Sequence, residues 1–153
     1  MYLPYTIEEL RDNTEVQIMD RKSVRIDPKD LAKTIIAFAN ADGGWIAIGI
    51  EDNGDITGVD NYDKQVNELL LAPVNLCIPS VIVETEFIDH LDIKGNRNHV
   101  LVMRVHQNSK NVVTNSADEA FIRIGDKSKK LDFNDRLQLT YAKGERYYED
   151  API

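Results

Sequence analysis

The chain has 153 residues, 42% of them hydrophobic, which is enough for one domain to bury a core without disulfides or metals. No apolar run is long enough to span a bilayer, and the first residues lack the pattern of a secretory signal, so we expect a cytoplasmic protein with no membrane partner. The net charge of −8 argues against a protein that coats nucleic acid through bulk positive charge.

The first part of the chain predicts a helix, a strand and a second helix. A capping box in the sequence TIEE, residues 6–9, predicts a short helix over about 7–13. Alternating apolar and polar residues then favour a strand within 16–26. An aspartate followed by proline starts the next pattern, whose apolar spacing predicts a helix over about 28–41.

The segment AFANADGGWIAIGIEDNGDITGV, residues 37–59, predicts a helix end, a buried strand and a tight turn. The first glycine of the adjacent pair suits the left-handed position after a helix, and the second allows two backbones to approach closely. The tryptophan begins a short apolar run typical of a buried strand, and the Asn-Gly dipeptide favours a two-residue hairpin turn. We therefore expect structural roles for Gly43, Gly44, Trp45, Asn53 and Gly54.

The second half predicts another helix, a long hairpin, a further strand and a final helix. The first of these helices follows an N-cap at Asp60 and ends at Pro73, and the final helix follows Asp132. The strands are expected over 81–89, 99–106 and 121–125. The order of these elements predicts a single α+β domain with a mixed, mostly antiparallel sheet and packed helices.

Positive charge is concentrated in one part of the sequence. Residues 93–131 hold eight Lys or Arg against three Asp or Glu, so this segment is +5 within an acidic chain. Such an asymmetry fits a local basic surface that contacts nucleic acid, and it equally fits lysines that protect an exposed strand edge from aggregation. The single cysteine, Cys77, has no neighbouring histidine and is interpreted as a core residue.

Several common catalytic motifs are absent from the sequence. It has no phosphate-binding glycine loop, no Cys/His zinc pattern and no serine nucleophile motif. The remaining candidates are carboxylates, with Glu15 and Asp20 in one strand region and Asp52 among acidic neighbours at a turn. If they converge, they could bind a divalent cation that activates water against a phosphodiester. Acidic residues at a turn are more often simply solvated turn formers.

Three stretches of the chain resemble the Schlafen AlbA-type domain, a DNA-binding module of bacterial transcriptional regulators and RecG-related helicase-like proteins. Besides the glycine segment, EVQIMDRKS resembles that family's Glu-Phe-Lys motif, and AFIRIGDKSKKLDF resembles its strand with arginine, glycine and a following basic turn. The similarity covers about residues 10–145. It implies one α+β domain over residues 1–153, expected to be the N-terminal part of a longer protein.

The resemblance implies binding of DNA or RNA in transcription regulation, by a domain that we expect to be non-catalytic and to require no cofactor. The residues expected to bind nucleic acid are Lys22, Arg123, Lys127, Lys129 and Lys130. The alternative is a metal-dependent ribonuclease, because animal Schlafen proteins of related fold cleave RNA with an acidic trio.

In that alternative the catalytic and metal-binding residues are Glu15, Asp20 and Asp52, or Glu51 if the alignment shifts by one, with Mg or Mn as the ion. Asp20 stands where the family has glutamate, and the shorter side chain changes the metal geometry. A third hypothesis is a protein-interaction or oligomerisation domain, for example a homo-oligomer formed through an acidic face.

Overall fold

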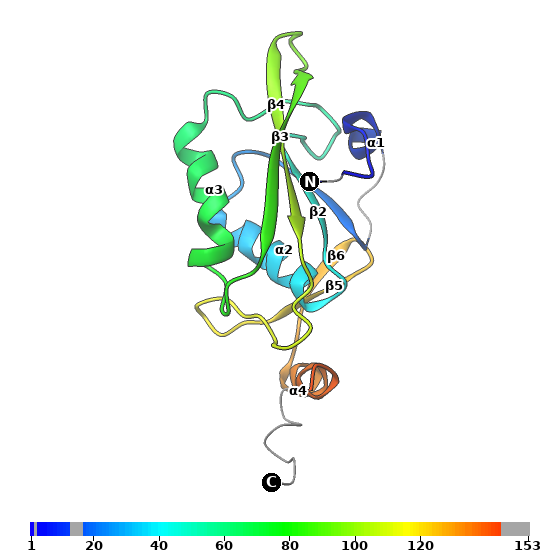
Figure 1. Cartoon of the computed structure of the whole chain (residues 1–153), viewed down its shortest axis with the longest axis vertical. Coiled ribbons are helices and arrows are strands. Elements are labelled where there is room, and N and C mark those ends of the chain that lie inside the picture. The colour runs from blue at the N-terminus through cyan, green and yellow to red at the C-terminus, as the bar shows by residue number, and fades with distance from the viewer. Residues whose placement is uncertain (2, 13–16, 145–153) are drawn as a thin grey trace.

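The structure is a computed structural model that describes residues 1, 3–12 and 17–144 (Figure 1). Within these residues it forms a single α+β domain, which confirms the expected fold class. The helices are α1 (Ile7–Asp12), α2 (Pro28–Asn40), α3 (Asp63–Asn75) and α4 (Phe133–Ala142). The strands are β1 (Met19–Lys22), β2 (Gly44–Ile48), β3 (Val83–Leu91), β4 (Arg97–Val105), β5 (Phe121–Ile124) and β6 (Lys127–Lys130).

The main sheet has four strands in the order β1-β2-β4-β3. β1 runs parallel to β2, whereas β4 is antiparallel to both β2 and β3, so the sheet is mixed as expected. β5 and β6 form a separate two-stranded antiparallel hairpin. Figure 1 shows α1 and α3 on opposite sides of the main sheet, with α4 beyond the β5–β6 hairpin. No helix in the described part of the chain has the length and apolar character needed to cross a membrane.

Helix α2 is the centre of the larger core. Its start follows the sequence signals, because the side chain of Asp27 accepts a hydrogen bond from the Lys29 N–H at 2.8 Å and proline occupies the first turn. Apolar residues of α2 pack with β2, β4, α3 and the first residue of β5 in one buried cluster. A helix that is apolar on most of its faces is stable only when covered on several sides, which explains its central place.

Helix α1 covers part of the other face of the sheet. The predicted capping box is confirmed, with the Thr6 and Glu9 side chains each accepting a hydrogen bond from the other residue's N–H at 3.1 Å. Ile7 and Leu10 are buried in a second cluster with residues of β1, β2 and β4. Cys77 is buried in the larger cluster, as expected, and its burial raises the pKa of the thiol to about 12.

The two adjacent glycines have the predicted structural roles. Gly43 has a φ of +75° and donates its N–H to the Phe38 carbonyl at 2.8 Å, which closes the end of α2. A Cβ on Gly43 would lie 2.6 Å from the Val105 carbonyl oxygen, and one on Gly44 would lie 2.5 Å from the Phe38 ring. The pair therefore allows the turn and the close contact between α2 and the strands.

The turn at Asn53-Gly54 forms, but it is not a two-residue hairpin. The Glu51 N–H donates to the Asp55 carbonyl and the Gly54 N–H donates to the Glu51 carbonyl, so the loop contains three residues. Gly54 has a φ of +92°, which is the left-handed conformation that such a loop requires. Beyond it, residues 55–59 form only one isolated bridge, between Ile50 and Ile56. The Thr57 and Gly58 N–H groups also donate to the Gly49 carbonyl, at 2.9 and 3.0 Å, so the segment pairs back on the residues after β2 as expected but forms no regular strand.

Two predicted boundaries of helix α3 are also wrong. The helix begins at Asp63 and not directly after Asp60, whose carboxylate instead contacts His99 Nδ1 at 2.8 Å. Pro73 lies inside the last turn and does not end the helix, which continues to Asn75. Because Pro73 lies near the C-terminal end of α3, it disturbs only one turn of backbone hydrogen bonds.

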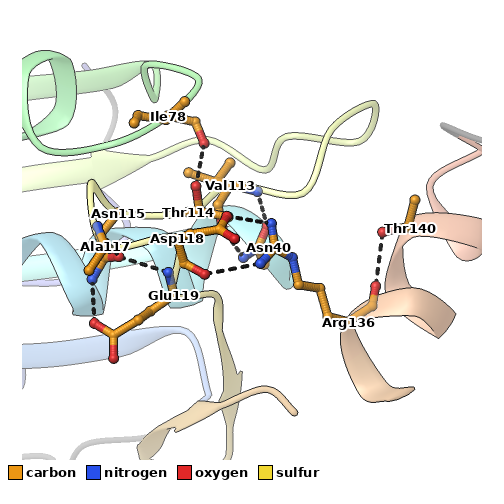
Figure 2. A network of polar contacts seen from close by, with 10 residues as sticks. All are labelled: Asn40, Ile78, Val113, Thr114, Asn115, Ala117, Asp118, Glu119, Arg136 and Thr140. Carbon is orange, nitrogen blue, oxygen red and sulfur yellow. Dashed lines mark hydrogen bonds and ion pairs between the residues drawn. The ribbon is translucent and has the colours of Figure 1, made fainter. Parts of the chain in front are cut away.

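The loop between β4 and β5 is fixed to helix α2 by one buried amide. Asn40 Nδ2 donates to the Val113 carbonyl at 2.9 Å, and Asn40 Oδ1 accepts the Val113 N–H at 2.8 Å (Figure 2). Asn40 Nδ2 also donates to the Phe121 carbonyl at 2.9 Å. Lys143 Nζ, at the end of α4, donates to the same Oδ1 at 3.0 Å. A single side chain thus positions the strand β5 and helix α4 relative to the core.

Candidate nucleic-acid interface

The β5–β6 hairpin presents two lysines on its outward face. In the register, Ile124 is opposite Lys127 and Ile122 is opposite Lys129, whereas Phe121 and Arg123 alternate with them and point inward. Lys127 and Lys129 are exposed, and among the described residues neither forms an ion pair with a carboxylate. The sequence indicates a basic turn after the strand with Arg123, and strand β6 is not predicted there because its four polar residues give no apolar alternation.

Arg123 lies in the interior, which corrects the expectation that it contacts phosphate at the surface. Its Nη1 lies 2.8 Å from Asp20 Oδ2, with both side chains 1% exposed, and its Nη2 donates to the Met19 carbonyl at 3.2 Å. The guanidinium also lies over the Phe38 ring, 4.8 Å from the centroid. Arg123 therefore connects the hairpin to β1 and α2, and its positive charge pairs with the buried Asp20 carboxylate.

The other two predicted cations are partly neutralised. Lys22 Nζ lies 3.6 Å from Asp20 Oδ2 and the side chain is 27% exposed. Lys130 Nζ lies 2.9 Å from the carboxylate of Glu119. Hydrogen bonds from Asn115 and Lys130 lower the pKa of Glu119, so its negative charge persists opposite Lys130. Lys127 and Lys129 are therefore the more available members of the predicted set.

The remaining cations of the segment 93–131 do not gather at the hairpin. Lys94 and Arg97 lie at the turn that joins β3 and β4, whereas Arg104 lies near the other end of β4, 3.7 Å from Glu84. The excess charge of this segment thus does not form a single basic surface. The sequence places these residues close together, but the length of β4 separates them in space.

The carboxylates predicted for a metal site are not arranged as a ligand set in the described residues. Asp20 Oδ1 accepts the Arg21 N–H at 2.7 Å, and Oδ2 is occupied by Arg123, so this buried side chain does not fit a metal ligand. Asp52 is exposed in the turn, and its carbonyl accepts a hydrogen bond from Arg21 Nη2 at 3.3 Å. Glu15 lies outside the described residues. Within residues 1, 3–12 and 17–144, no three His, Cys, Asp or Glu side chains form a group that could hold a metal.

A hollow of about 610 Å³ lies at the end of the sheet where β2 finishes and β4 begins. Several of its lining polar groups bind one another. Arg25 pairs with Glu51 at 2.9 Å, and the buried Asn98 donates to Asp92 at 3.1 Å while accepting the Asp60 N–H at 3.0 Å. These contacts give the buried polar groups of the hollow partners within the protein.

The mixed four-stranded sheet, the flanking helices and the appended lysine hairpin define a small α+β domain. A sequence model of the family described as Schlafen, AlbA_2 matches residues 15–132. The chain belongs to this family. This confirms the resemblance drawn from the glycine segment and its two flanking motifs.

One solved structure with a similar fold is the crystal structure of the DIP2311 protein from Corynebacterium diphtheriae. The TM-score is 0.55 and the sequence identity 20%, over 83% of this chain and 27% of that chain. The similarity therefore concerns the fold, and the chain spans about a quarter of the length of that protein. No curated protein matches the chain significantly.

Proposed function

We propose that this domain binds nucleic acid and that the outward face of the β5–β6 hairpin contacts the phosphates. The observation that supports the proposal is the exposure of Lys127 and Lys129 on one face of a hairpin, without carboxylate partners among the described residues. Membership of the Schlafen, AlbA_2 family favours the same function. The finer assignment, the DNA-binding part of a bacterial transcriptional regulator or RecG-related protein, belongs to the same proposal and rests on the resemblance of the motifs.

A test follows from the salt dependence of phosphate binding. Each lysine that binds a phosphate of duplex DNA releases counterions, so removing that lysine reduces the slope of log affinity against log salt by about 0.9. The double variant Lys127→Ala/Lys129→Ala should therefore bind labelled DNA or RNA more weakly, with a slope reduced by about two. Fluorescence anisotropy over a range of salt concentrations measures both quantities.

The matched control removes two exposed lysines elsewhere, in the variant Lys94→Ala/Lys110→Ala. It changes the net charge equally but leaves the hairpin intact. An equal loss of affinity in both variants would assign binding to overall charge and not to the hairpin. Unchanged binding in the hairpin variant, or no binding by the native domain at low salt, would reject the proposal.

The ribonuclease alternative depends on the carboxylates and not on the lysines. It requires Asp20 to serve as a ligand, although its carboxylate is engaged by Arg123 and the Arg21 N–H. The test is to incubate structured RNA with the domain and Mg or Mn. RNA cleavage by the native domain that disappears in Asp52→Ala would support the nuclease. No cleavage, or equal cleavage by the variant, would reject the nuclease and leave nucleic-acid binding as the proposed function.

Self-association is supported by one feature, the free edge of β3. This strand ends the four-stranded sheet, and among the described residues only β4 pairs with it. A long strand with an unpaired edge is a site where another chain can add a strand. Sedimentation of the domain over a range of concentrations tests this candidate, and a monomer at the highest concentration would reject it.

A further inference from the structure

A row of side chains crosses the sheet at the end where β2 begins. The register aligns Met19 of β1, Trp45 of β2, Arg104 of β4 and Glu84 of β3. Residues aligned across a sheet project to the same face, which here is the face that carries α1. The α1 cluster covers the next row along the strands, so Trp45 lies at its rim and is only partly buried.

Within this row, Arg104 contacts both of its neighbours. The guanidinium of Arg104 lies over the Trp45 ring, 5.3 Å from the centroid. Glu84 Oε2 lies 3.7 Å from Arg104 Nη1 and 2.7 Å from His106 Nε2, so one carboxylate holds both side chains. The Arg104 side chain nevertheless remains 44% exposed, which leaves part of its planar group accessible to solvent.

The row borders a hollow of about 370 Å³. Its lining includes Trp45, Arg104 and His106, whose side chains are all planar π systems, together with the exposed Ile18. The volume falls within the range of small-ligand sites. Asp42 lines the hollow, and the Glu84 carboxylate lies against Arg104 beside it. The negative charges of these two residues keep the hollow from being strongly basic. Its chemistry therefore favours flat, uncharged groups over bare phosphate.

Residues 17 and 18 join this hollow to the lysine hairpin. The side-chain amide of Gln17 donates to the Arg123 carbonyl at 2.8 Å and accepts the Gly125 N–H at 2.7 Å. The next residue, Ile18, accepts the Trp45 N–H at its carbonyl, at 2.8 Å. The residues that enter β1 thus contact the β5–β6 hairpin on one side and Trp45 on the other.

We propose that Trp45 and Arg104, with His106, form a stacking site for an unpaired base of single-stranded nucleic acid. The proposal rests on the proposed function and adds the substrate class. Unpaired bases stack on aromatic rings and on arginine guanidinium planes, whereas bases within a duplex have both faces covered by their neighbours. The phosphate backbone of the nucleic acid lies on Lys127 and Lys129, and one unpaired base turns away from that backbone and enters the hollow.

The test uses the single tryptophan of the chain as its own reporter. A single-stranded oligonucleotide should quench the fluorescence of Trp45 on binding, whereas a duplex of the same sequence should not. Arg104→Ala should weaken single-strand binding about tenfold, with the salt slope unchanged, because stacking contributes affinity without counterion release. Arg104→Lys keeps the positive charge but lacks the planar guanidinium, so its affinity for single strands should be as low as that of Arg104→Ala. Lys94→Ala serves as the control and should bind normally.

The outcomes separate this inference from the proposed function. Binding without quenching, together with normal affinity of Arg104→Ala, would overturn the stacking site and leave the hairpin function intact. Quenching that persists in Lys127→Ala/Lys129→Ala with unchanged affinity would support the stacking site and reject the hairpin. Equal quenching by a free mononucleotide and by the oligonucleotide would reject a polymeric substrate and thus the inference as stated. No binding of any nucleic acid would reject both.

Discussion

The carboxylate of Asp20 and the guanidinium of Arg123 form an ion pair of 2.8 Å in which both side chains are 1% exposed. They are separated by 103 positions in the chain. The pair joins β1 of the main sheet to β5 of the separate hairpin, so it fixes the lysine face relative to the core. Because the pair is buried, Arg123 does not contact phosphate at the surface and Asp20 is not available as a metal ligand.

Removing one partner of this pair should destabilise the domain strongly. Arg123→Ala leaves the Asp20 carboxylate buried without its main partner, and the expected loss is about 3 to 5 kcal/mol in the free energy of unfolding. Urea denaturation measures it. The double variant Asp20→Leu/Arg123→Met should lose less than the sum of the two single changes, because no uncompensated charge remains. Stability of Arg123→Ala equal to that of the native chain would contradict the structural role.

Replacing the buried amide of Asn40 should also be costly. Asn40→Ala leaves the Val113 N–H and the carbonyls of Val113 and Phe121 without their partner, and each unsatisfied buried group costs about 1 to 3 kcal/mol. We expect a total loss of at least about 3 kcal/mol by chemical denaturation. As a control, Asn96→Ala changes an exposed asparagine and should stay within about 0.5 kcal/mol of the native value.

Gly43 and Gly95 provide a matched pair for the cost of a side chain at positive φ. Both have positive φ, +75° and +81°, but a Cβ on Gly95 meets no atom of the described residues within 4 Å. Gly95→Ala should therefore cost only the conformational strain, about 1 kcal/mol. Gly43→Ala adds a contact with the Val105 carbonyl and should cost more, and Gly43→Val more still. Equal losses of stability in the two alanine variants would show that the strand contact is unimportant.

His99 should make the stability depend on pH. Its ring nitrogens lie 2.8 Å from Asp60 and 2.7 Å from Asp89, and the hydrogen bond to Asp60 is the main cause of its raised pKa. A raised pKa in the folded state adds stability below the unfolded value of about 6.5, and this stability is lost as the pH rises through the folded value. The melting temperature of the native chain relative to His99→Gln should therefore decrease from about pH 6 to about pH 8. A constant difference over that range would contradict the role of the imidazolium.

Local chemistry made much of the fold predictable. The capping box at Thr6, the cap at Asp27 and the left-handed position at Gly43 depend on neighbours within a few residues, and all three are confirmed. Two of the errors occur where a distant residue decides the local structure. Asp60 does not cap α3 because His99 binds it, and the β6 strand forms only because β5 supplies its hydrogen bonds.

The sequence by itself determined the class of domain, the positions of most helices and strands, and the family, because these depend on periodicity, turn chemistry and local motifs. Only the tertiary structure decided which cations reach solvent and which side chains meet. Arg123 and Lys127 are four residues apart, yet one is buried against Asp20 and the other is exposed. Likewise, Arg104 stacks on Trp45 because the strand register aligns residues far apart in the chain, and register is set by the packing of the whole sheet.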